Sequence, residues 1–385
     1  MNGLQIGDLS AKLPIIQGGM GVAVSLSGLA SAVANEGGIG IISSASIGML
    51  MPDFSKNFRN ANQMALREEI RKAREKTDGI IGVNIMVALS DYEDHLTVAV
   101  EEKADLIISG AGLPIRMPDS VIKDKKEENR TKFLPIVSSG KAAGLIFRYW
   151  ETHYGVIPDA VVVEGPKAGG HLGYKKQQIV HPDYLLENIL PSVIAALKPF
   201  ELRFGREIPV IAAGGIYTGA DMFRLMKLGA RGVQIGTRLV PTFECDASVA
   251  FKEAYVNSTP EDIVLIDSPV GLPGRAINNK FLQDVAAGKR NPVNCPWKCL
   301  KTCDYKKAPY CISLALINAA KGKLKNGFVF AGSNAYKTEK IQSVKAVLHE
   351  MITEYENFRL AENTRKLQNT VKHFYRKKTE EVVLS

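Results

Sequence analysis

Residues 208–238 read IPVIAAGGIYTGADMFRLMKLGARGVQIGTR, and this stretch is the strongest indication of the fold class. A short β-rich run ends at the glycine pair 214–215, apolar residues then recur at helical spacing over residues 220–228, and a second β-rich run ends at Gly236. Two such strand ends would set free backbone N–H groups side by side. This arrangement suits a phosphate, because glycine lets an anion approach the backbone at the start of a helix. An ordinary βαβ unit, whose glycines only form turns, is the alternative.

The same alternation of strand and helix runs through the rest of the chain. Apolar runs that read as strands occupy residues 13–19, 37–44, 78–86, 104–112, 133–140, 159–165, 208–213 and 232–237. Strands that are nearly continuous in apolar residues, each followed by a helix, predict an α/β protein with a (β/α)8 TIM barrel; an open doubly wound sheet is the alternative. In a barrel, phosphate commonly binds the loops after strands seven and eight. Gly214, Gly215 and the Gly236-Thr237 pair fall on those loops, which strengthens the phosphate prediction.

Other strand ends place small or polar residues at the same rim. Gly19 and Met20 follow the first strand, Asn84 closes the third and Glu164 the sixth. Glycine at so many strand ends can admit a large flat ligand against the backbone, while Asn84, Glu164 and Gln234 offer hydrogen-bond partners. The chain does not open with a G-x-G-x-x-G dinucleotide fingerprint. A flat cofactor with a phosphate tail, such as FMN, therefore fits better than a dinucleotide.

His171 is the candidate catalytic residue. It lies in EGPKAGGHLGY (164–174), and among six histidines it alone is flanked by glycines on the loop after strand six. An imidazole near its ordinary pKa exchanges a proton at neutral pH, which suits proton removal next to an electron-withdrawing group or protonation of a carbanion. A loop histidine that only bonds a carbonyl is the alternative. Four of the other histidines, His95 among them, lie in charged helical contexts and are expected on the surface.

These motifs together resemble a known family. The set PIIQGGMG, GVNIM, SGAGLP, EGPKAGGHLG, PVIAAGGI and QIGTR is similar to the nitronate monooxygenase family, formerly 2-nitropropane dioxygenases, and to its close relative, the FMN-dependent enoyl-ACP reductase II. The resemblance covers about residues 10–285. It implies a TIM barrel that binds FMN without a covalent bond, with His171 as catalytic base or acid. The residues that it places on FMN are Gly19, Met20, Asn84, Glu164, Gly169, Gly214, Gly215, Gln234, Ile235, Gly236 and Thr237.

The resemblance implies one of two reactions on a small-molecule substrate. As a monooxygenase, the chain would oxidise alkyl nitronates with O2 while His171 abstracts or steers a proton. As an NAD(P)H-dependent enoyl-ACP or enoyl-thioester reductase, it would work with acyl carrier protein, and His171 would help to protonate the substrate α-carbon. Glu164 stands where many nitronate oxidisers carry Gln, and Lys167 where they carry Glu, so the reductase alternative stays open. A phosphate-binding isomerase barrel without flavin is a third option.

Four of the five cysteines lie close together after the barrel. Cys295, Cys299, Cys303 and Cys311 form a C-x3-C-x3-C-x7-C pattern. In a cytosolic protein, clustered thiols are typical metal ligands rather than disulfides. The spacing differs from the C-x2-C pairs of most zinc sites, so an iron–sulfur cluster is expected, with zinc or three reduced thiols on one helical face as alternatives. With a cluster, the chain could instead be a flavin and iron–sulfur electron-transfer subunit with an electron-transfer partner.

The composition of the whole chain limits these interpretations. With 385 residues, 45% of them apolar and 23% charged, the chain reads as globular, and it has no run of about 18 uncharged apolar residues that would span a membrane. Its first residues lack a basic-then-apolar signal pattern, so a cytoplasmic location is expected. The net charge is +9, concentrated in the C-terminal tail. No aromatic-interleaved basic motif accompanies this charge, so no nucleic-acid partner is expected.

Three segments are expected: an FMN-binding barrel over residues 1–285, a Cys-rich segment over 286–330 and a helical extension over 331–385. In the last segment, apolar residues recur at helical spacing from Ile341 to Phe358. This stripe predicts a helix that packs on the barrel or on a second subunit of a homodimer.

Overall fold

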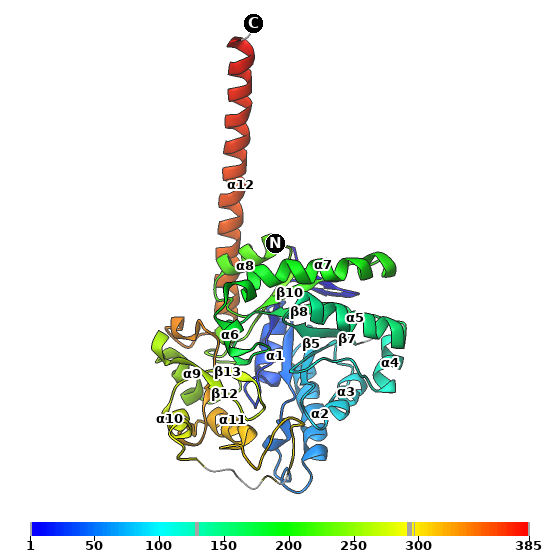
Figure 1. Cartoon of the computed structure of the whole chain (residues 1–385), viewed down its shortest axis with the longest axis vertical. Helices are drawn as coiled ribbons and strands as arrows, with labels where there is room; N and C mark the ends of the chain where they lie inside the picture. Colours follow the sequence, from blue (N-terminus) through cyan, green and yellow to red (C-terminus); the bar gives the residue numbers. More distant parts are fainter. Residues whose placement is uncertain (1, 128–130, 291–294, 296, 384–385) are drawn as a thin grey trace.

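An eight-stranded parallel sheet forms the centre of the chain in the computed structural model, which describes residues 2–127, 131–290, 295 and 297–383 (Figure 1). Its order is β3-β11-β10-β8-β7-β6-β5-β4. Backbone bonds from Ile39 N to Ile15 O and from Gln17 N to Ile39 O bring the segment before β4 beside β3, so the sheet nearly closes into a barrel. The TIM-barrel prediction is confirmed. The strands are β3 (Ile15–Gln17), β4 (Gly40–Ser43), β5 (Ile81–Met86), β6 (Leu106–Gly110), β7 (Lys132–Val137), β8 (Val161–Glu164), β10 (Val210–Ala213) and β11 (Gly232–Ile235).

Alternate residues of these strands belong to two different cores, because successive side chains of a strand point to opposite faces. On β8, Val162 belongs to the cluster inside the barrel, whereas Val161 and Val163 belong to the cluster between the sheet and the helices. The hairpin β1 (Leu4–Ile6) and β2 (Leu9–Ala11) adds Leu4 and Ile6 to the inner cluster. The hairpin therefore closes the barrel at the N-terminal ends of the strands.

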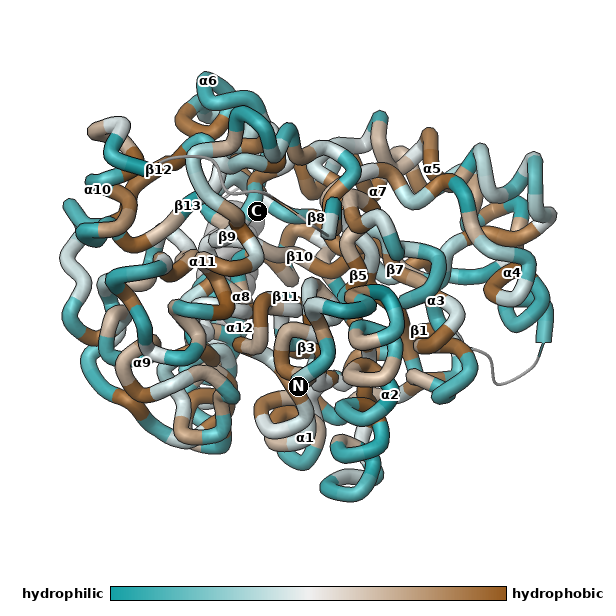
Figure 2. The backbone as a smooth tube through the Cα atoms, turned by 90° about the horizontal axis from the view of Figure 1, so that it is seen from below, coloured by the Kyte–Doolittle hydropathy of each residue, from teal (hydrophilic) through white to brown (hydrophobic). Residues whose placement is uncertain are grey.

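Helices surround the sheet, as the view from below shows (Figure 2). In α5, Ser139 caps the first turn by accepting from Ala142 N, Gly155 ends the helix in the left-handed conformation, and Phe147 and Trp150 are buried against the sheet. The other helices between strands follow the same design, with one apolar face toward the sheet. These helices are α1 (Ser27–Asn35), α2 (Phe58–Lys76), α3 (Tyr92–Glu101), α4 (Asp119–Lys125), α5 (Gly140–Tyr154), α7 (Leu186–Phe204) and α8 (Gly219–Lys227).

The C-terminal helix α12 (Val344–Val383) takes the place of the eighth helix of the ring. It packs against α8 and α1. Its buried residues are Val344, Val347, Leu348, Met351 and Tyr355, and Glu354 accepts a hydrogen bond at 2.7 Å from Gly219 N, in the first turn of α8. The expected apolar stripe thus packs on the barrel, although the helix begins at Val344, after Ile341. Beyond this contact, α12 stands clear of the rest of the molecule (Figure 1).

The chain between β11 and α12 builds a second, smaller sheet beside the barrel. The order of this sheet is β12-β13-β14, and β9 pairs with β13. The strands are β9 (Gly170–His171), β12 (Ile263–Asp267), β13 (Pro273–Ile277) and β14 (Val329–Phe330), and the helices around them are α9 (Val249–Val256), α10 (Lys280–Ala286) and α11 (Ile312–Ala320). The outer hydrophobic core continues from the barrel into this region, since Ile277, Tyr310 and Phe328 belong to the same cluster as Val163.

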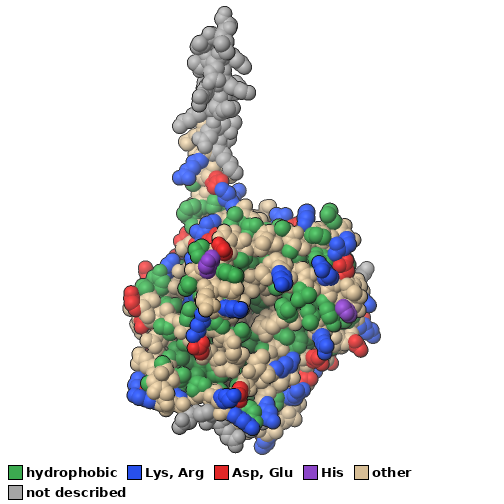
Figure 3. Space-filling view, viewed as in Figure 1, with side chains coloured by type: hydrophobic (Ala, Val, Ile, Leu, Met, Phe, Trp, Pro, Cys, Tyr) green, Lys and Arg blue, Asp and Glu red, His purple; other side chains and the backbone are tan. Residues whose placement is uncertain are grey.

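Short elements complete the described chain. They are α6 (Lys176–Ile179) and the 3-10 helices η1 (Ile47–Leu50), η2 (Pro182–Tyr184), η3 (Thr237–Leu239), η4 (Pro260–Asp262), η5 (Leu324–Asn326) and η6 (Ala335–Lys337). Among the described residues, no helix is both long and apolar enough to cross a membrane. On the face shown in Figure 3, Lys and Arg side chains are interspersed with Asp and Glu.

Candidate functional site

A large pocket opens at the C-terminal ends of the barrel strands. It encloses about 1700 Å³ of space between atoms, part of it continuous with solvent. Parallel strands all end at one rim, which brings residues far apart in the sequence together. The pocket is lined by every residue that the sequence analysis assigned to cofactor or catalysis: Gly19, Met20, Asn84, Glu164, Gly169, His171, Gly214, Gly215, Gln234, Ile235, Gly236 and Thr237.

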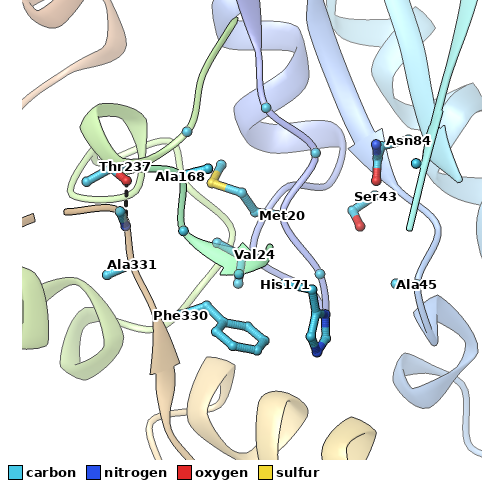
Figure 4. Close-up of a pocket in the computed structure, with 18 of the residues that line it drawn as sticks. Met20, Val24, Ser43, Ala45, Asn84, Ala168, His171, Thr237, Phe330 and Ala331 are labelled. Carbon is cyan, nitrogen blue, oxygen red and sulfur yellow. Dashed lines mark hydrogen bonds between the residues drawn. The ribbon is translucent and has the colours of Figure 1, made fainter. Parts of the chain in front are cut away.

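One end of the pocket is made of backbone from three loops. Gly214 and Gly215, after β10, have φ of 93° and 87°, values that L side chains rarely adopt. Thr237, after β11, accepts a hydrogen bond on Oγ1 from Gly332 N at 2.9 Å (Figure 4). Asn334 donates from Nδ2 to Gly215 O at 2.7 Å. These bonds hold small residues of the three loops around one space, as a phosphate cradle requires.

The segment 331–334 is a part of this wall that the sequence analysis missed. Its residues Ala331, Gly332, Ser333 and Asn334 follow β14 and line the pocket. The available signal was the sequence FVFAGSN, an apolar run that ends in small residues like the other strand ends. Ser333 Oγ and Gln234 Oε1 are buried without a hydrogen-bond partner in the described part of the chain. Such atoms fit a ligand that supplies polar partners.

The loop after the first strand forms another wall. A Cβ atom on Gly19 would lie 2.1 Å from Asn84 Cβ, so only glycine allows this loop to pass so close to β5. Asn84 donates from Nδ2 to Ile108 O at 3.3 Å, which holds its amide in place. The Met20 side chain extends from this loop toward the loop that carries Thr237 (Figure 4). The space between the two walls can accept a flat ring system.

His171 lies on β9, held by its pairing with β13 across from Gly274. Its Nε2 is 2.7 Å from Ser268 Oγ, and its ring meets Phe330 edge-on with centroids 5.0 Å apart. Burial lowers the pKa of His171 from 6.5 to about 4. The expectation of a nearly ordinary pKa is therefore wrong, because the pocket walls remove the solvent that would stabilise the imidazolium. At neutral pH the ring is neutral and can accept a proton.

Glu164 ends β8 and presents a carboxyl to the same pocket. Burial raises its pKa from 4.5 to about 7, so both protonation states are populated near neutral pH. Tyr174 fixes the strand end by donating from its hydroxyl to Glu164 O at 2.6 Å. The pocket thus holds a neutral base and a carboxyl that titrates near pH 7, which suits proton transfer.

Arg275 supports the loop between Glu164 and His171. It lies on β13, is buried, and donates from Nη1 to Pro166 O at 2.6 Å and to Ala168 O at 2.5 Å. Burial lowers its pKa from 12.5 to about 10, so the guanidinium stays charged at neutral pH. Its contacts with carbonyl oxygens fix the loop that carries Gly169 into the pocket.

The four clustered cysteines lie outside this pocket but next to it. Cys295, Cys299, Cys303 and Cys311 all line a second, smaller cavity. Residues 295 and 297–311 contain no helix, so the alternative of three thiols on one helical face is wrong. In the described residues, no group of three or more His, Cys, Asp or Glu side chains is placed to hold a metal ion.

His95 also departs from the expectation. Its side chain is fully buried on α3, with Nδ1 2.8 Å from Ser44 Oγ and Nε2 3.2 Å from Asp91 Oδ2. Both partners are themselves buried. A surface position was predicted and is wrong, because His95 lies with Asp91 on the buried face of α3, whereas Glu93 is on the exposed face.

The family model for nitronate monooxygenase matches residues 4–354. The chain belongs to the nitronate monooxygenase family. The match extends the motif resemblance, which covered about residues 10–285, through the small sheet and into α12. Membership in the nitronate monooxygenase family makes the chain a flavin-dependent oxidoreductase.

Relatives of this family member differ in their described activities. It is 28% identical over 277 residues to (3aS,4S,5R,7aS)-5-hydroxy-7a-methyl-1-oxo-octahydro-1H-indene-4-carboxyl-CoA dehydrogenase of Mycobacterium tuberculosis, a match that covers 72% of this chain and 66%, just under two thirds, of that protein. It is 26% identical over 314 residues to a probable nitronate monooxygenase of Staphylococcus aureus, which covers 72% of this chain and 79% of the relative.

Two solved structures are similar along nearly their whole length. FabK from Thermotoga maritima is 27% identical with a TM-score of 0.69, covering 94% of this chain and 96% of FabK. A nitroalkane oxidase from Streptomyces ansochromogenes has a TM-score of 0.69 at 20% identity, covering 91% of this chain and 98% of the oxidase. At that identity the second likeness concerns the fold alone.

Proposed function

We propose that the chain binds FMN and uses it to oxidise alkyl nitronates. In this proposal, His171 accepts the substrate proton or hydrogen-bonds the nitronate. The observation that carries this proposal is the arrangement of one pocket, which has a glycine-lined cradle at one end and a neutral, partly buried imidazole in its wall. The match to the nitronate monooxygenase family supports nitronates as the first substrate class to test.

Residues of both pocket walls would hold FMN. Backbone N–H groups of Gly214, Gly215 and Gly236, with Ser333, would bind the phosphate. Asn84 and Gln234 would hydrogen-bond the ring system, since both side chains line the space and Gln234 Oε1 lacks a partner in the described part of the chain. When bound, FMN supplies a two-electron acceptor.

His171 would act on the substrate beside the ring. The neutral imidazole can take a proton from a carbon next to a nitro group, or hold the nitronate by a hydrogen bond. Ser268, 2.7 Å from Nε2, fixes the orientation of the ring. The edge of the Phe330 ring limits the space beside the His171 imidazole, and it would keep water away from the proton that the imidazole accepts.

Reduction of an enoyl thioester with NAD(P)H is the second candidate, and Glu164 favours it. A carboxyl with a pKa of about 7 can deliver a proton to a carbanion at neutral pH. A likeness to FabK at 27% identity and to a dehydrogenase whose name specifies a CoA substrate supports this candidate.

Anaerobic reduction of the FMN-loaded protein distinguishes the two candidates. For nitronate oxidation, we expect ethylnitronate to bleach the flavin absorption in the wild type, while NADH and NADPH leave it unchanged. Bleaching by NADH or NADPH alone would overturn this proposal in favour of the reductase. With neutral nitroethane, which must still lose its α-proton, His171→Ala should keep FMN but bleach at least about 100-fold more slowly than the wild type, which is the usual contribution of a general base. The exposed His153 provides the control, since His153→Ala should bleach at the wild-type rate.

A further inference from the structure

The small cavity beside the main pocket is built from thiols. Its wall contains Cys295, Cys299, Cys303 and Cys311, and it encloses about 380 Å³ of space between atoms, part of it open to solvent. None of the four forms a disulfide. Each of these thiols is a soft metal ligand once deprotonated.

We propose that these four cysteines bind one iron–sulfur cluster, which accepts electrons from the flavin in the main pocket. Zinc fits less well. Zn–S bonds of about 2.3 Å require sulfurs that converge on one point, and the described thiols do not converge in this way. A cluster keeps its cysteine sulfurs further apart, because several irons and inorganic sulfides lie between them. Thiols that surround a cavity without meeting at a point match the cluster.

The surroundings of the cavity suit an anionic cluster. Lys298 N points at Cys295 Sγ at 3.5 Å, and Ser313 Oγ lies 3.6 Å from Cys299 Sγ. Cys311 is the N-cap of α11, so its thiol lies at the positive end of this helix. Hydrogen bonds to sulfur and the positive end of a helix both stabilise the charge of a thiolate-bound cluster.

Only a thin wall separates the two cavities. Leu300 and Ile312 line both of them, so a single layer of side chains lies between a cluster and the main pocket. Polar contacts cross the same wall, because Ser313 Oγ, next to Cys299, is 2.9 Å from Ser46 Oγ, and both serines line the main pocket. A cluster here would lie close enough to the flavin for direct electron transfer.

The redox step, which rests on the proposed function, needs an external acceptor, because the nitronate already supplies two electrons to the flavin. We assign this role to a soluble one-electron carrier protein with an acidic surface, because Lys298 lines the cavity, Lys301, Lys306 and Lys307 are exposed in the same segment, and Asp304 is the only acidic residue of residues 297–311. Each encounter reduces the carrier by one electron and oxidises the cluster by one. Two encounters remove the two electrons that a reduced flavin holds, and its two protons pass to solvent.

Iron and sulfide analysis of the full chain, purified without oxygen and reconstituted with ferrous iron and sulfide, tests the site independently of FMN. We expect iron and acid-labile sulfide in equal amounts, about two or four of each per chain, and an EPR signal after reduction with dithionite. Cys303→Ser, at a partly exposed thiol, should lose at least half of the iron. The matched control is Cys245→Ser, because Cys245 is buried elsewhere and its Sγ donates to Val24 O at 3.3 Å, a bond that serine can keep.

Three results would overturn the cluster: wild-type protein without iron, wild-type protein that holds only zinc, or equal iron in Cys303→Ser and Cys245→Ser. Circular dichroism of each variant shows whether the variant is folded. If a variant is unfolded, the iron and zinc content of the wild-type protein alone tests the cluster.

Electron transfer has its own test. The radical EPR signal of partly reduced FMN should relax several times faster in the wild type than in Cys303→Ser, because a paramagnetic cluster lies nearby. Equal relaxation would overturn the link to the flavin while leaving the cluster intact. A protein with iron, sulfide and no bound FMN would instead contradict the proposed function.

Discussion

Glu164 and His171 respond to the same environment in opposite ways. Burial disfavours the charged form of each group, so it raises the pKa of the carboxyl to about 7 and lowers the pKa of the imidazole to about 4. At neutral pH, His171 is therefore uncharged and Glu164 is poised between its two forms. Two groups whose pKa values are pushed in opposite directions in one pocket are a typical pattern of acid–base sites.

The first prediction concerns the effect of pH on FMN affinity. A flavin beside Glu164 would remove more water from the carboxyl and raise its pKa further, so binding would be accompanied by proton uptake above pH 7. The dissociation constant for FMN should therefore be constant between pH 5.5 and 6.5 and should rise above pH 7, by up to about tenfold per pH unit. Quenching of FMN fluorescence on addition of apoprotein, measured at several pH values, gives this curve.

Glu164→Gln supplies the comparison for this measurement. The amide keeps the shape of the side chain but does not titrate, so its dissociation constant should stay flat across the same pH range. If the variant shows the same rise above pH 7 as the wild type, the pH dependence belongs to another group, and Glu164 does not face the flavin.

Residue types at the pocket could be predicted from the sequence, but their electrostatics could not. Strand ends and glycines located Asn84, Gln234 and His171, because parallel strands bring their ends to one rim. The lowered pKa of His171 depends on Phe330 and on β13, which lie far away in the chain. His95 was misjudged for the same reason, since its burial against Ser44 comes from a different strand end.

At the scale of elements, the loop after β10 joins the phosphate end to the loop that carries the catalytic residues. A Cβ atom on Gly214 would lie 2.7 Å from Gly165 O and 3.1 Å from Ala168 N, and the φ of Gly214 is +93°. Backbone atoms cannot move aside as the end of a side chain can. The cradle and the Glu164–His171 loop therefore depend on one glycine.

The second prediction is that Gly214→Ala weakens FMN binding by at least about tenfold, a loss of about 1.4 kcal/mol, because the displaced loop opens the cradle. The strained φ alone should cost about 1–3 kcal/mol of stability. Gly205→Ala is the control. Gly205 ends α7 with φ +62° and no atom within 4 Å of an added Cβ, so this variant should lose stability but bind FMN normally. Fluorescence titration and thermal melting measure the two effects, and equal FMN affinity in both variants would contradict the role of this loop.

Long apolar elements were easier to predict than short ones. All eight barrel strands follow from continuous apolar runs, since strands buried on both faces leave such runs in the sequence. The two-residue strands β9 and β14 are too short to leave a pattern, and their pairing with β13 depends on the tertiary fold. The wall formed by Ala331 to Asn334 was missed because it follows β14.

At the scale of the molecule, α12 makes the C-terminal region part of the barrel. The segment between β11 and α12 returns the chain to the ring after building the small sheet and the cysteine cavity. The apolar stripe from Ile341 to Phe358 was visible in the sequence, but its partner was not, because an amphipathic helix does not specify the surface that it covers. The contacts with α8 and α1 identify that surface.

The third prediction follows from this packing. Met351 is fully buried between α12 and the barrel, whereas Leu360, further along the same helix, is 56% exposed. Met351→Ala should reduce the free energy of unfolding by about 2–5 kcal/mol, because it removes buried methylene groups and leaves a cavity. Leu360→Ala should change it by no more than about 0.5 kcal/mol. Thermal melting of both variants at several protein concentrations measures the difference. If the two variants melt together, α12 is an independent extension. If the wild-type melting temperature rises with protein concentration and Leu360→Ala removes this rise, the exposed part of α12 joins a second subunit.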